Sequence, residues 1–327
     1  MLLNLKTWFA HEVYVLSPQQ IAGDEHAHKV RVWDTLHFGH NLRTFTVYGL
    51  VVTASLALSL WLKSRPFFKK VGGFIDQATV FAPDLIRVVF GASLIFSARH
   101  QAVFGPELPI DSFSYHQLIG PFLYVSGLLL ILGLGTRLFG LLTAAFWLLT
   151  LADRGWYMLT YLNYFGEALA LVLLRRQNFA LDRFISGKRA KTGAADRWAM
   201  PLTRIFFGLA LLYAAINVKF VTAALSLDVV NRYELTRYFH FDPLFVVLGA
   251  GLIESLIAVL YILGLLNRLN SLMFIGFVAV SIWFFKETVW PHYLLLGLAA
   301  GIFLHKPDFL AVDGRLFNRH KRPARLK

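Results

Sequence analysis

The sequence predicts an all-α fold: a polytopic transmembrane helix bundle of about nine spans, built from two parallel four-helix repeats plus one extra N-terminal span. Three observations lead to this prediction. Hydrophobic residues make up 57% of the chain and charged residues only 16%, whereas a soluble surface needs far more charge. The apolar residues gather in runs long enough for membrane helices. The second half of the chain repeats, with changes, the first half.

Each expected span is an apolar run bounded by turn signals or charges. A helix needs about 20 residues to cross a bilayer, and only the fourth run is clearly short. Gly133 and Gly264 mark tight connections, and Pro291 and Pro307 lie near the ends of the last run. The nine expected spans cover residues 42–62, 83–99, 118–135, 138–152, 157–174, 201–220, 243–266, 269–285 and 289–305.

The repeat appears as pairs of matching residues in the two halves. Residues 84–98 align with residues 201–215, and the alignment continues to the end of each half. The aligned pairs are Arg87 with Arg204, Gly91 with Gly208, Arg137 with Arg268, and Asp182 with Asp313. Each half holds four spans, an even number, so both halves share one orientation in the membrane. The repeat is therefore parallel, and the first span lies outside it.

These boundaries divide the chain into six parts. The parts are an external N-terminal tail (1–40), the first span with a basic cytoplasmic loop (41–82), the first four-helix module (83–183), a basic cytoplasmic linker (184–200), the second four-helix module (201–315) and a basic cytoplasmic tail (316–327).

An amphipathic helix that lies at the membrane surface is also expected over 24–43, before and at the start of the first span.

The distribution of Lys and Arg predicts the orientation. The segment 174–200 holds seven basic residues against two acidic ones, and with nine spans it falls on the same side as the C-terminus. That side holds 22 of the 32 Lys and Arg, so the positive-inside rule places it in the cytoplasm and the N-terminus outside. We expect a location in the plasma (inner) membrane. The net charge of +13 is thus explained by topology and contact with lipids, not by nucleic-acid binding.

The chain has no Cys, which bounds its redox chemistry. Disulfides, thiolate nucleophiles, iron–sulfur clusters and Cys-ligated haem are excluded as contributions of this chain. Any redox chemistry must use a bound cofactor, a metal held by His and carboxylates, or a partner.

The second module resembles the DoxX/DoxD-like family of four-helix membrane proteins. The residues that carry the resemblance are Arg204, Gly208, Lys219, Glu254, Leu263-Gly264, Arg268 and Val312-Asp313. The first module keeps part of this pattern but has Ala102 opposite Lys219 and Leu123 opposite Glu254. The resemblance implies a membrane subunit linked to quinone, sulfur or oxidative-stress redox chemistry.

Two carboxylates inside the spans are the candidate catalytic residues, Glu167 and Glu254. An ionised carboxylate in the bilayer costs at least about 2.5 kcal/mol, so each must pair, protonate or touch water. Either residue could transfer protons or anchor a quinone head; the alternative is a polar contact that holds helices together. Glu254 is expected about 16 Å along its helix, at mid-membrane, as a protonated or hydrated acid.

The candidate substrate-binding residues are Arg204, Asn217, Lys219 and His292. Lys219 is expected near the outer surface and Arg204 near the inner one, so neither should lie level with Glu254. A structural interpretation of the four paired arginines is that they lie at cytoplasmic helix ends and extend to lipid phosphates. The four are Arg87, Arg137, Arg204 and Arg268.

The external tail is rich in histidine. His26 and His28, and then His37 and His40, have spacings that could place two imidazoles on one metal ion. We expect either a copper, zinc or haem site there or, as the alternative, histidines that simply suit a membrane surface.

Three functions remain open from the sequence. The first is a membrane subunit of a quinone-linked redox complex, with the tail and the loops 100–117 and 226–242 forming an external docking face for a soluble redox partner. The second is a small-solute or proton-coupled transporter, which needs a polar cavity between the modules that reaches both glutamates. The third is a structural or assembly protein without chemistry.

Overall fold

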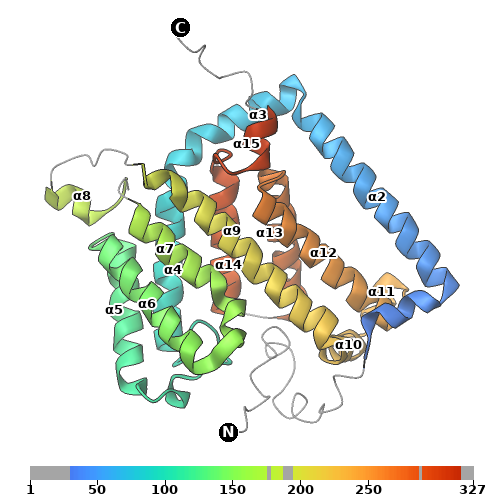
Figure 1. The fold of residues 1–327 in the computed structure, drawn as a ribbon, viewed down its shortest axis with the longest axis horizontal. Helices are drawn as coiled ribbons and strands as arrows, with labels where there is room; N and C mark the ends of the chain where they lie inside the picture. The colour runs from blue at the N-terminus through green and yellow to red at the C-terminus, as the bar shows by residue number, and fades with distance from the viewer. Residues whose placement is uncertain (1–29, 175–177, 187–193, 287–288, 318–327) are drawn as a thin grey trace.

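The computed structural model describes residues 30–174, 178–186, 194–286 and 289–317, and the fold over these ranges is all-helical (Figure 1). The one β contact in them is an isolated antiparallel bridge between Ala102 and Pro109. The predicted all-α class is therefore confirmed.

The helices follow the expected apolar runs within a few residues at most ends. The α-helices are α2 (Gly39–Lys63), α3 (Pro66–Asp76), α4 (Ala82–Arg99), α5 (His116–Leu132), α6 (Thr136–Arg154), α7 (Leu162–Leu173), α8 (Leu181–Ser186), α9 (Asp196–Ala215), α10 (Ala223–Arg232), α11 (Thr236–Phe239), α12 (Pro243–Leu263), α13 (Asn267–Phe285), α14 (Trp290–Leu304) and α15 (Val312–Phe317). The 3-10 segments are η4 (Val32–His37), η5 (Gln77–Phe81), η6 (Ile110–Ser112) and η7 (Gly155–Tyr161), and η8 (Ile216–Val221) is π-helical.

Several helices have the dimensions of membrane spans, so the chain is of the multi-pass membrane type. In the part of the chain that the structure describes, six helical stretches are long and apolar enough to cross a bilayer: Gly39–Lys63, Pro66–Arg99, Thr136–Leu173, Asp196–Val221, Pro243–Leu263 and Asn267–Phe285. The helices α5 and α14 are apolar but shorter. Within Thr136–Leu173 the chain reverses at η7, because α6 packs against α7.

Three segments differ from the expectation. The loop expected after the first span contains α3, whose exposed Phe67 and Phe74 suit the membrane surface. The loop 226–242 contains most of α10 and all of α11. The surface helix expected over 24–43 is wrong over its described part, where η4 is followed by the start of α2; the residues before 30 lie outside the description.

Matching helices of the two halves make matching contacts. The first helix of each half packs against the second, α4 on α5 and α9 on α12, and the third against the fourth, α6 on α7 and α13 on α14. Gly91 and Gly208 allow the first of these approaches. A Cβ added to Gly91 would lie 2.7 Å from the oxygen of Gly127, and one added to Gly208 would lie 2.8 Å from that of Ala258.

The halves also meet in a reciprocal way. The helix α7 packs on α9, and α14 packs on α4, so the last helix of each half lies against the first helix of the other. At the two seams Gly166 faces Phe206 and Gly297 faces Val89, and a Cβ on either glycine would collide with that neighbour. The seams are therefore close-packed at both positions.

The helix α2 stands away from this bundle and is held at its two ends (Figure 1). At one end Lys63 pairs with Asp313 at 2.5 Å. At the other end the Asn41 amide donates to Thr35, whose hydroxyl donates to Asp242 at 3.3 Å. Between these ends no residue of α2 is buried, and most are exposed. The end of the molecule that holds α3, α8 and α15 is called the basic end below, and α10 and α11 lie at the opposite end.

Candidate functional site

Glu254 lies on the face of α12 that packs against α9 and η8. Gly251 and Ala258, three residues before and four after it, both face that neighbour. A Cβ on Gly251 would lie 2.8 Å from the Cβ of Lys219. Lys219 therefore lies about one helical turn from Glu254 along α12. The two residues are offset, as expected, but only by this short distance.

Lys219 lies on the π-helical turn η8, which continues α9. A π turn holds more residues than an α turn, and such turns occur frequently at functional sites. Within η8 the Asn217 carbonyl accepts from both the backbone N–H and the hydroxyl of Thr222, at 2.9 and 2.7 Å. The Lys219 Nζ donates to the hydroxyl of Ser226 at 3.3 Å. Two predicted binding residues, Asn217 and Lys219, therefore lie on one irregular turn.

The site is neither sealed nor fully open. Asn217, Lys219 and Glu254 are all half-buried. On the same turn Ile216 is 42% exposed and Val221 is 49% exposed. In a bilayer these two side chains contact lipid, so η8 borders the hydrocarbon region.

From Glu254 toward the basic end, the contact between α12 and α13 contains further polar groups. The Tyr261 hydroxyl donates to Ser271 at 3.1 Å, and the Asn270 amide donates to the carbonyl of Ile257 at 3.0 Å. Glu254, Ile257 and Tyr261 are spaced at i, i+3 and i+7 and share one face of α12. Sequence reasoning missed this set, although polar residues at helical spacing inside apolar spans were the available signal.

The matching positions of the first module are mostly apolar. In the register that places Arg137 over Arg268, Leu123 matches Glu254, Leu130 matches Tyr261 and Phe139 matches Asn270. Leu123 and Leu130 are fully buried and belong to the hydrophobic core. In the register that places Arg87 over Arg204, Ala102 matches Lys219 and is also buried.

Arg87 and Arg204 do not extend to lipid, and the structural interpretation given to them is wrong. They are 0% and 1% exposed. Arg204 donates to the carbonyls of Tyr261 and Ile262, the second at 2.7 Å. Arg87 does the same with Leu130 and Ile131 at the end of α5. Each guanidinium therefore caps the C-terminal end of a neighbouring helix, where carbonyls lack partners.

The other two arginines differ from one another. Arg268 is half-buried and donates to the Gly72 carbonyl at 2.9 Å and to Asp76 at 2.6 Å, so it holds α3 rather than lipid. Arg137 is exposed and donates to the Val172 carbonyl at 2.8 Å. Only Arg137 keeps the accessibility that contact with lipid phosphates requires.

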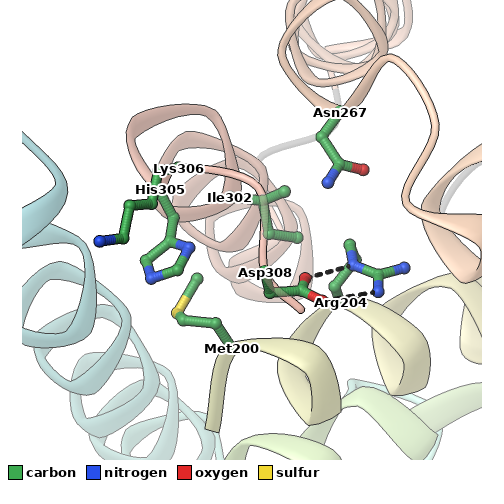
Figure 2. Close-up of a pocket in the computed structure, with 7 residues that line it drawn as sticks. All are labelled: Met200, Arg204, Asn267, Ile302, His305, Lys306 and Asp308. Atoms are coloured by element: carbon green, nitrogen blue, oxygen red, sulfur yellow. Dashed lines mark hydrogen bonds and ion pairs between the residues drawn. The ribbon is translucent and has the colours of Figure 1, made fainter. Parts of the chain in front are cut away.

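Around Arg204 lies a small pocket at the basic end (Figure 2). Its cavity volume is about 10 Å³, close to the space that a single water molecule needs. Asp308 pairs with Arg204 at 2.9 Å on one side of it. The residues that line the pocket are Met200, Arg204, Asn267, Ile302, His305, Lys306 and Asp308.

Glu167 lies apart from this set, at the seam between α7 and α9. It is fully buried, and the hydroxyl of Thr203 donates to its Oε2 at 3.2 Å. In the register of the repeat its counterpart is Leu298. This position suits the expected helix-to-helix contact, and the neighbouring Gly166 packs directly against Phe206.

The histidine candidates do not gather around Glu254. His292 is buried in the first turn of α14, which packs mainly on α4 and α13. His37 and His40 are exposed at the start of the described chain, and His26 and His28 lie outside the described residues. Among the described residues, no group of three or more His, Asp or Glu is placed to hold a metal ion.

No protein-family model, curated protein or solved structure matches the chain.

Proposed function

We propose that the chain crosses the membrane nine times as two parallel modules that follow an N-terminal span. The nine crossings are α2, α4, α5, α6, α7, α9, α12, α13 and α14. The matching helix contacts, the two capping arginines and the reciprocal seams support two related modules. The positive-inside rule then places the basic end in the cytoplasm.

This orientation predicts protease sensitivity from one side only. In intact cells the linker 184–200 is expected to resist an added protease, because translocating a basic segment against the membrane potential is unfavourable. The tail 1–40 is expected to be cut. In inverted vesicles the pattern should reverse. Cleavage between Lys188 and Lys191 in intact cells would contradict the topology.

We further propose that the second module binds a quinone head group as the membrane subunit of a DoxX/DoxD-like redox complex. The observation that carries this proposal is the difference between the modules. Lys219 and Glu254 lie within one turn of each other beside η8, where the first module has Ala102 and Leu123. A bundle of this kind therefore packs without those charges, so their presence favours a function over a packing role.

The chemistry at η8 matches a quinone. A quinone has two carbonyl oxygens that need hydrogen-bond donors, and the ammonium of Lys219 and the amide of Asn217 supply them. Glu254 is placed to exchange the proton that accompanies reduction or oxidation. The apolar tail would reach the bilayer past Ile216 and Val221. Electrons would come from or go to a soluble redox partner at the external face.

The test is retention and binding of quinone by the whole chain purified in mild detergent. Solvent extraction should recover quinone in stoichiometric amount, and a short-chain quinone added to stripped protein should bind saturably. Replacing Lys219 with Met should weaken that binding roughly tenfold, the loss of one charged hydrogen bond. Arg137→Met, at the exposed arginine of the first module, is the matched control. Absence of both retained quinone and saturable binding would refute the proposal.

A further inference from the structure

Two buried asparagine side chains of α13 have an oxygen without a hydrogen-bond partner in the described chain. Asn267 is 7% exposed and Asn270 is 1% exposed, and neither Oδ1 atom accepts a hydrogen bond there. Leaving such an acceptor unsatisfied in a protein interior is energetically costly. In proteins the usual solution is an ordered water molecule held by several polar groups.

The two oxygens lie between the pocket at the basic end and Glu254. Asn267 itself lines the pocket, as Figure 2 shows. Asn270 follows one turn deeper on the same face of α13, and its amide donates to the carbonyl of Ile257. Ile257 is three residues from Glu254 on α12. The hydroxyls of Tyr261 and Ser271 form a hydrogen-bonded pair between the same two helices.

The first module shows that the fold does not require the row of polar residues between α12 and α13. This row consists of Glu254, Tyr261, Asn267, Asn270 and Ser271 and is called the polar line. Phe139 stands where Asn270 stands, Leu130 where Tyr261 stands and Leu123 where Glu254 stands. The matching position of Asn267 stays polar, as Thr136, and Ser126 stands where Ile257 stands; both side chains are buried. Polar groups in a membrane interior are costly unless they line water or pair with each other.

We propose that α12 and α13 enclose a single-file water path that carries protons between the basic end and Glu254. The proposal rests on the proposed function for its end point. A quinone that is reduced takes up two protons with two electrons, and a quinol that is oxidised returns them. Asn267, Asn270 and the Tyr261–Ser271 pair hold the waters, and Glu254 exchanges the proton with the bound quinone.

The absence of Cys from the chain allows a direct test with a probe the size of water. Asn270→Cys introduces a single thiol on the line, and Phe139→Cys introduces one at the matching position of the first module. Silver ions, which bind thiolates and are comparable in size to a water molecule, are added to right-side-out and to inverted membrane vesicles. The thiols left unreacted are then counted with a fluorescent maleimide after denaturation.

Asn270→Cys is expected to react with silver roughly tenfold faster in inverted vesicles, since only the basic end opens onto the water path. Phe139→Cys should stay unreactive from both sides. Ser271→Cys, which conserves size, provides the same measurement if Asn270→Cys fails to fold. A thiol that reacts no faster than Phe139→Cys, or equally from both sides, would overturn the proposal.

The result is separable from the quinone proposal. If silver reacts with Asn270→Cys as expected but no quinone binds, the water path is supported and the quinone proposal is refuted. Quinone binding without silver access would refute the path alone.

Discussion

Replacing Arg204 with Met is expected to lower the stability of the folded chain by roughly 3–5 kcal/mol, the cost of breaking a buried ion pair by removing one partner. The variant leaves the carboxylate of Asp308 buried without its cation. It also removes the donor from the carbonyls of Tyr261 and Ile262 at the end of α12. Reversible unfolding in mixed micelles, followed by circular dichroism, measures the loss.

Two comparisons identify the cause of that loss. Arg137→Met removes one hydrogen bond from an exposed arginine and should cost no more than about 1 kcal/mol. Combining Arg204→Met with Asp308→Asn should recover part of the stability, because the unpaired charge is gone. Lys at position 204 should not restore it, since an ammonium lacks the planar fork of donors. Equal stability of Arg204→Met and Arg137→Met would show that the capping role is unimportant.

Replacing Glu254 with Gln is expected to abolish redox activity with the quinone while the protein inserts and folds normally. Gln keeps the shape and a hydrogen bond but cannot exchange a proton at the site. Glu254→Leu, which copies the residue of the first module, should be at least as stable as the parent, because a costly group leaves the membrane. Thermal unfolding and quinone turnover in proteoliposomes measure the two effects separately.

The reverse exchange in the first module is the matched control. Leu123 is fully buried and the position matching Lys219 is Ala102, so Leu123→Glu should destabilise by at least about 2.5 kcal/mol. If Glu254→Leu is as active as the parent, then Glu254 has no functional role. The chain would then be better described as a structural or assembly protein.

Much of the fold was predictable because its strongest signals are local. Long apolar runs locate the helices, and Gly133 and Gly264, both with positive φ, end α5 and α12 where the sequence marks turns. The matching of Asp182 with Asp313 was also informative. Their backbone N–H groups donate to the carbonyls of Gly133 and Gly264, each at 3.1 Å.

The parts that were missed depend on contacts between distant segments. Arg204 looked like a membrane-surface residue, since nothing near it in the sequence shows that Asp308 and the end of α12 surround it. The π turn that carries Lys219 was missed because such a turn leaves no mark in the spacing of apolar residues. Glu254 itself could be found from its cost in a bilayer and from its Leu counterpart, without any structure.

The way α2 is attached has a consequence for biosynthesis. Its partner at the basic end, Asp313, is made about 250 residues after Lys63, which at 5–20 residues per second is a delay on the order of ten seconds or more. Until Asp242 is made, 207 residues after Thr35, α2 has neither of its contacts with later segments and must remain in the bilayer on its own. A helix with no polar stripe along its length, surrounded by lipid even in the finished protein, meets that requirement. Asp313, which is made after every spanning helix of the described chain, would then complete the attachment of α2.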